Sequence, residues 1–124
     1  MKRSEWIYQG QIDCFGIPKK DRDGIISYAV EEVAKAGGDL QFRKLPNRYD
    51  TDRYKLHCEI GDGDPRSFWL MMRHLAALMP EDHPEQTVEG YDRLGMQRED
   101  LVLKGRRVYR QAWEWSPAQQ RPLR

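Results

Sequence analysis

The sequence has few of the residues on which most metal and redox sites depend. Its 124 residues include two cysteines and three histidines, and these form none of the usual metal-ligand spacings. No apolar run is longer than five residues, whereas a membrane-spanning helix needs roughly 20. The charged first residues lead directly to Trp6, without the apolar core of a secretory signal. We therefore expect a cytoplasmic protein without a metal, a cofactor, a disulfide framework or a membrane span.

The composition is that of a small folded domain. Hydrophobic residues make up 39% of the chain and charged residues 33%, and four Trp, six Tyr and three Phe supply large apolar side chains. A chain of this length suits one domain. We expect a single α+β domain over residues 1–115, followed by a flexible C-terminal tail over residues 116–124, which contains two prolines.

The small net charge of +1 hides two segments of opposite sign. Residues 81–100 carry seven acids against two arginines, whereas residues 101–124 carry six basic residues against Glu114 alone. The two segments either attract each other within the fold or form surfaces for different partners. Arg outnumbers Lys by 14 to 7, which is typical of GC-rich coding and favours a bacterial or mobile-element source.

Two changes of hydrophobic period predict the first elements. Residues 6–14 alternate apolar and polar side chains, which indicates a half-buried strand. From Asp21 or Asp23 the period becomes helical, with a capping Asp at the start, a stop at residues 37–38 and one apolar stripe made of Ile26, Ala29, Val30 and Val33.

The middle of the chain predicts a hairpin and a second helix. Residues 39–43 and 53–60 alternate as strands and are separated by a short turn-rich segment, which favours antiparallel pairing. Asp64 is placed to cap a helix that starts at Pro65 and ends at Pro80. Its apolar residues are so many that we expect it to be buried on most of its circumference.

The C-terminal third is less regular. Residues 81–100 have no strong period and indicate a loop with a short helix. Residues 101–115 fit a strand, or a strand pair bent at Gly105, and also fit a helix. The aromatic residues and Gly105 favour the strand. The order strand–helix–strand–strand–helix–strand resembles, in architecture alone, a ferredoxin-like split βαβ sandwich.

No constellation of residues points to catalysis. Cys14 and Cys58 lie on apolar strand faces, where a thiol is unreactive. Asp62 and Asp64 are explained by a turn and a helix cap, and the segment 16–20 lacks a phosphate-loop pattern. We name no catalytic and no metal-binding residue, and a non-enzymatic protein is the favoured interpretation.

The strongest candidate for function is a basic aromatic segment near the C-terminus. Arginines suit contacts with carboxylates or phosphates, and aromatic side chains anchor protein interfaces or stack on bases. We expect a binding module that contacts a partner protein or a second copy of itself, such as a small inhibitor, adaptor or accessory protein. Binding of RNA or single-stranded DNA is the alternative, and a small enzyme is the third. The candidate contact residues are Arg106, Arg107, Tyr109, Arg110, Trp113 and Trp115.

Overall fold

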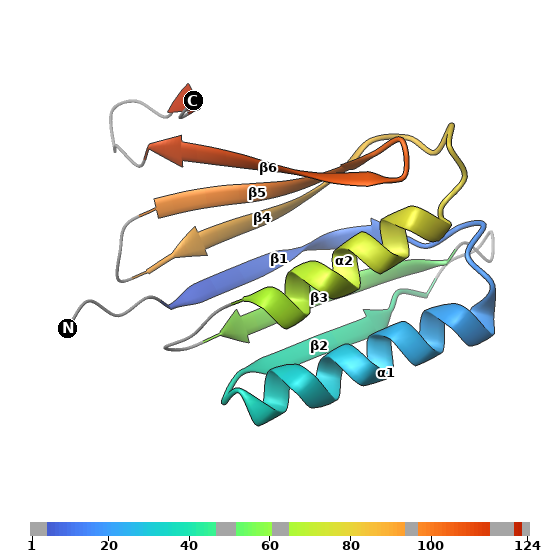
Figure 1. Ribbon diagram of the computed structural model, residues 1–124, viewed down its shortest axis with the longest axis horizontal. Helices are drawn as coiled ribbons and strands as arrows, with labels where there is room; N and C mark the ends of the chain where they lie inside the picture. Colours follow the sequence, from blue (N-terminus) through green and yellow to red (C-terminus); the bar gives the residue numbers. More distant parts are fainter. Residues whose placement is uncertain (1–4, 47–51, 61–64, 94–96, 115–120, 123–124) are drawn as a thin grey trace.

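Two helices and an antiparallel sheet form the α+β domain predicted from the sequence. The computed structural model describes residues 5–46, 52–60, 65–93, 97–114 and 121–122 (Figure 1). The sheet has the strand order β2-β3-β1-β4-β5-β6-β7, and all its pairs are antiparallel. The elements are β1 (Trp6–Asp13), α1 (Lys19–Lys35), β2 (Asp39–Lys44), β3 (Arg53–Ile60), α2 (Arg66–Leu78), β4 (Gln86–Asp92), β5 (Gln97–Lys104), β6 (Arg107–Glu114) and β7 (Arg121–Pro122).

The core lies between the helices and one face of the sheet. α1 and α2 lie over β1, β2 and β3, and the later strands extend the sheet beyond α2 (Figure 1). On β3, Tyr54, Leu56, Cys58 and Ile60 are buried toward the helices, while the residues between them are half-buried or exposed. The predicted period of two is therefore confirmed for β3, whereas β1 buries Ile7 on one face as well as Tyr8 and Ile12 on the other.

α2 packs as predicted on one side and differs on the other. Phe68, Met71, Met72 and Leu75 are fully buried, at helical spacing. Leu70 and Leu78 are exposed, at 41% and 40%, so the expectation that most of the circumference is buried is wrong. α2 has the more apolar face of the two helices. Within the described residues, neither helix is long and apolar enough to cross a membrane.

α1 differs from the prediction at its start and along its stripe. It begins at Lys19 after Pro18, and no side chain caps it, so Asp21 lies within the first turn. Val30 is exposed, whereas Arg22 is buried. The guanidinium of Arg22 lies 2.6 Å from a carboxylate oxygen of Asp52, and this ion pair lets a charged residue occupy a buried position. The predicted cap of the second helix, Asp64, lies outside the described residues.

The prediction of a loop over residues 81–100 is wrong, because β4 and the start of β5 lie there. The inward positions of β4 hold Val88, Gly90 and Asp92. Only Val88 is apolar, so the alternation of apolar and polar residues that predicts a strand is weak. Gly90 is required by its neighbours, since a Cβ there would overlap the ring of Tyr8 and lie 2.5 Å from the Glu99 carbonyl oxygen.

The favoured strand pair over residues 101–115 is confirmed as β5, a two-residue turn and β6. Gly105 and Arg106 form the turn with φ values of 58° and 64°, in the left-handed region that such tight hairpins require. β7, two residues long, pairs with Trp113 and Glu114 and falls in the segment predicted as a tail.

We predict that Gly90→Ala lowers the free energy of unfolding by about 1–3 kcal/mol, because the added methyl group forces the ring of Tyr8 or the β4–β5 backbone to move. Chemical denaturation of both proteins measures the difference. Gly24→Ala in α1 is the matched control, since no atom lies within 4 Å of its added Cβ. It should raise stability by about 0.5–1 kcal/mol through helix propensity. Equal effects of the two substitutions would contradict the close packing at Gly90.

A candidate binding groove between α2 and β6

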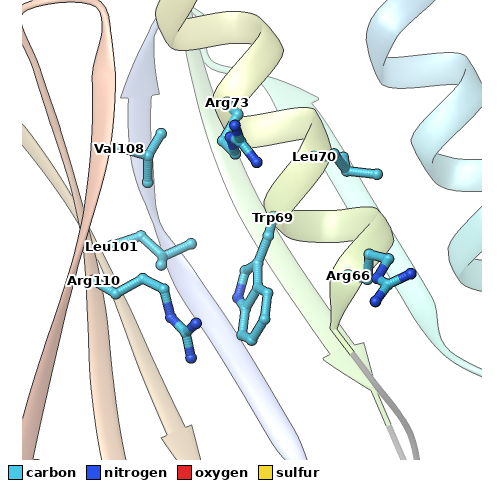
Figure 2. A pocket seen from close by; sticks show the side chains of 7 residues that line it. All are labelled: Arg66, Trp69, Leu70, Arg73, Leu101, Val108 and Arg110. Atoms are coloured by element: carbon cyan, nitrogen blue, oxygen red, sulfur yellow. The ribbon is translucent and has the colours of Figure 1, made fainter.

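A groove runs between α2 and the β5–β6 hairpin, on the helix-covered face of the sheet (Figure 2). It consists of two adjoining hollows of about 480 and about 640 Å³. The two share four lining residues, Leu70, Arg73, Val108 and Arg110. The first hollow adds Arg66, Trp69 and Leu101, and the second adds His74, Ala77, Arg106 and Arg107.

The α2 wall is one stripe of the helix. The six lining residues of α2 occupy positions i, i+3, i+4, i+7, i+8 and i+11 from Arg66, so they share one face. The opposite face, which includes Phe68, Met71 and Leu75, is buried against the sheet. Burial of that face fixes the rotation of α2, so the mixed arginine and apolar stripe lies on the exposed side of the helix, with Trp69 half-buried.

Trp69 is held in place by a residue of the core. Its indole N–H donates to the hydroxyl of Tyr8 at 3.0 Å. Tyr8 is fully buried and stacks on Phe68, with ring centroids 4.6 Å apart. Burial raises the pKa of Tyr8 well above its usual value, so the hydroxyl that accepts this bond stays protonated. Trp69 thus reaches the groove in a fixed orientation.

Arg110 connects the opposite wall to Trp69. Its guanidinium lies over the indole ring, 4.1 Å from the ring centroid, and Figure 2 shows the two side chains facing each other. The same guanidinium donates twice to Glu99 on β5, at 2.9 and 3.0 Å. The side chain of Glu99 is only 11% exposed, so this bidentate pair satisfies a nearly buried carboxylate. It also joins an acid of the acidic segment to an arginine of the basic one.

The hairpin turn is tied to α2 separately. Arg106 adopts a φ of 64°, which costs a non-glycine residue about 1 kcal/mol or more. Its Nε donates to the Met79 carbonyl at the end of α2, at 3.0 Å. This bond offsets part of the backbone strain and holds the second end of the groove to the helix.

The groove is strongly cationic. Five arginines line it, and its lining residues include no acid within the described chain. Glu99 compensates Arg110, whereas no carboxylate of the described residues pairs with Arg73, Arg106 or Arg107. These arginines lie beside apolar side chains, and such a surface attracts an anionic group that also carries apolar parts.

The six residues predicted as a contact patch do not share one surface. Arg106, Arg107 and Arg110 line the groove, whereas Tyr109 lies on the opposite face of β6, 50% exposed. Trp113 belongs to β6 but its side chain is not described, and Trp115 lies outside the described residues. Residues of a single strand alternate between two faces, so contiguity in sequence could not give one patch.

Most of the contribution of α2 to the site was missed, because Arg66, Leu70 and Arg73 are not among the contact residues predicted from the sequence. Their spacing from Arg66 was the available signal, because an arginine recurs after seven residues with Trp69 and Leu70 between. The same spacing is typical of an ordinary amphipathic helix, so it did not distinguish a binding surface from a solvent-exposed helix face.

Of the groups considered for catalysis or metal binding, the two cysteines are described, whereas Asp62 and Asp64 lie outside the described residues. Burial raises the pKa of both Cys14 and Cys58 to about 12, which keeps these thiols protonated and unreactive at neutral pH. Among the described residues, no three His, Cys, Asp or Glu side chains gather as a metal site would require.

Comparison with known proteins gives no match: no family model, no curated protein and no solved structure matches the chain.

We predict that the two partners of the Glu99–Arg110 pair differ in the cost of their removal. Arg110→Ala leaves a nearly buried carboxylate unpaired and should lower the free energy of unfolding by about 2 kcal/mol. Glu99→Gln leaves a half-exposed guanidinium that water can solvate, and should cost about 1 kcal/mol.

Urea unfolding of the two single variants and of the double variant measures this difference. The double variant should lose less than the sum of the single losses, because it contains no unpaired buried charge. A larger loss for Glu99→Gln than for Arg110→Ala would contradict this account of the pair.

Proposed function

We propose that the protein is a non-enzymatic binding module that contacts a partner protein through the groove between α2 and β6. The segment that it binds carries acidic residues together with apolar ones. The observation that carries this proposal is the meeting, in one groove, of the arginines of α2 and of the β5–β6 hairpin around Trp69 and Leu70.

Two properties of the groove favour a protein partner. Arginine and tryptophan are the residue types that contribute most often to binding energy at protein interfaces. Trp69 and Arg110 are already held by Tyr8 and Glu99, so their ordering costs little when a partner binds. A preorganised cationic groove would act sterically, by covering an acidic surface of its partner, as a small inhibitor, adaptor or accessory protein of a bacterium or mobile element does.

RNA or single-stranded DNA is the second candidate, because the same arginines suit phosphates and Tyr109 is an exposed aromatic side chain. Base stacking requires aromatic faces beside the cationic track. Tyr109 lies on the other face of β6, and the ring of Trp69 is covered on one side by Arg110. These positions favour a protein segment over a nucleic acid.

We further infer that the protein is cytoplasmic. We also infer that the elements from β1 to β4 form a ferredoxin-like unit, which β5, β6 and β7 extend. The order β2-β3-β1-β4, with β1 antiparallel to both neighbours, supports this interpretation. In this arrangement the added hairpin supplies one wall of the groove, and α2 supplies the other.

We predict that a fluorescent peptide of about ten residues, alternating glutamate and leucine, binds the protein, and that binding weakens as salt is added. Arg73→Ala and Arg107→Ala should each weaken binding about tenfold, because each removes a charge-assisted contact. Fluorescence anisotropy measures the affinities. Arg43→Ala, an exposed arginine of β2 far from the groove in the sheet, is the control and should leave binding unchanged.

A uridine oligonucleotide of similar length serves as the competing probe. Tighter binding of the oligonucleotide than of the peptide, with a steep salt dependence that Arg107→Ala reduces, would establish the nucleic-acid alternative. Equal losses for Arg43→Ala and Arg73→Ala would show non-specific attraction and would reject the groove as the site.

A further inference from the structure

Three arginines around the second hollow of the groove have no carboxylate partner in the described residues. Arg73 comes from α2, and Arg106 and Arg107 come from the β5–β6 hairpin. By contrast, Arg22 and Arg110 each pair with a carboxylate of the protein. Like charges that line one hollow repel one another. An anion bound among these three arginines is therefore favoured both by direct attraction and by relief of that repulsion.

The backbone at Arg106 indicates that its side chain has a function in binding. Its φ of 64° places it in the left-handed region, at the turn position that glycine usually fills. Strained residues of this kind cluster at sites that hold ligands. Its Nε donates to the Met79 carbonyl at 3.0 Å, which holds the guanidinium beside α2. The other four N–H groups of this guanidinium have no partner within the described chain and are available to a ligand at the hollow.

The number of unpaired arginines favours a phosphoryl group over a carboxylate. A carboxylate has one negative charge on two oxygens, and one guanidinium satisfies it, as Arg110 satisfies Glu99. Among three arginines, one carboxylate leaves two positive charges uncompensated. A phosphomonoester carries about −1.5 to −2 charges at pH 7 and has three strong acceptor oxygens. It therefore complements three guanidinium groups better than a carboxylate does.

We propose that the groove binds a phosphorylated segment of the partner protein, so that phosphorylation of the partner controls binding. The phosphoryl group lies in the second hollow, among Arg73, Arg106 and Arg107. This proposal rests on the proposed function and specifies which anionic group the groove recognises.

The adjoining hollow favours a polypeptide as the source of the phosphoryl group. The apolar side chains of Trp69, Leu70, Leu101 and Val108 line this first hollow, and it is continuous with the second through Leu70 and Val108. The second hollow alone has a volume of about 640 Å³, whereas one water molecule occupies roughly 30 Å³. A phosphate ion would leave most of this space to water. A peptide with an apolar residue near its phosphorylated residue fills both hollows.

The same surface is less suited to the phosphates of a nucleic acid. Each phosphate of a nucleic-acid strand carries a single charge, and the bases beside it require aromatic faces on which to stack. Tyr109 lies on the opposite face of β6, and Arg110 covers one side of the Trp69 ring. The three arginines and the apolar hollow together therefore favour a phosphomonoester on a protein segment.

Peptides that differ in one group test the proposal on the full chain. Each labelled peptide has about seven residues, with leucine two positions before and two positions after a central phosphoserine, sulfoserine, glutamate or serine. Sulfoserine matches the tetrahedral shape of phosphoserine but has a single negative charge. At about pH 7.5 the phosphoryl group is mostly a dianion. Fluorescence anisotropy should then show the phosphoserine peptide binding at least about tenfold more tightly than the sulfoserine and glutamate peptides, and the serine peptide binding most weakly.

Variants of the protein locate the phosphoryl group. Arg106→Gly and Arg107→Gln should each reduce the preference for phosphoserine over glutamate about tenfold, because each removes a guanidinium from the second hollow. Glycine also relieves the positive φ of residue 106, so a strained turn cannot explain that loss. Arg43→Gln, at an exposed arginine of β2, is the matched control and should leave the preference unchanged.

The outcomes separate this proposal from the proposed function. If the phosphoserine and glutamate peptides bind equally tightly, and Arg73→Ala weakens both, the groove binds carboxylates, so the phosphoryl proposal is wrong and the proposed function stands. Equal affinities for phosphoserine and sulfoserine would reject the argument from charge. If no peptide binds, both proposals fail.

Two competitors test the source of the phosphoryl group. Inorganic phosphate should displace the phosphoserine peptide only at concentrations far above the Kd of the peptide. Displacement at concentrations close to that Kd would show that the hollow binds a small phosphorylated molecule and would overturn the assignment to a partner protein. A uridine oligonucleotide of similar length that binds more tightly than the phosphoserine peptide would overturn it in favour of a nucleic acid.

Discussion

The contact of Arg110 with Trp69 determines how the last strands of the sheet sit against α2. The two side chains come from different elements, and the Arg110 guanidinium lies 4.1 Å from the centroid of the Trp69 ring. A buried or nearly buried side chain holds each of them in place. Tyr8 in the core holds the indole, and Glu99 on β5 holds the guanidinium. Because all four residues depend on one another, the distance between α2 and β6 is fixed by the core itself, and the width of the groove follows from it.

Local geometry at the hairpin turn serves the same arrangement. Arg106 follows Gly105 in the turn and occupies the same left-handed backbone conformation, in which glycine would be more stable. Its hydrogen bond to the Met79 carbonyl spans from the turn to the end of α2. A glycine there would relax the backbone but remove both this bond and one of the cationic side chains of the groove. The turn therefore sacrifices some local stability for a second attachment between hairpin and helix.

The sequence predicted the elements that bury one face and failed where a polar or small residue occupies an inward position. Apolar residues recur at every second position of β3 and at helical spacing on the buried side of α2. Both elements were therefore predicted correctly. β4 was missed because Gly90 and Asp92 stand at inward positions. Gly90 leaves room for the ring of Tyr8, and the carboxylate of Asp92 accepts a hydrogen bond from the backbone just before β1. The arginines of the hairpin were predicted as contact residues, but their partners on α2 follow from the fold of the sheet, which sequence spacing does not contain.

The central claim is that the groove and its β6 wall form the binding surface. It is tested most directly by amide chemical-shift mapping of the labelled protein during titration with an acidic peptide. The account predicts shifts concentrated in residues 66–77 of α2 and in residues 101–112 of β5 and β6. Shifts concentrated instead on the open face of the sheet, around Gln9, Lys55 and His57, would contradict it, as would the absence of any shift at saturating peptide.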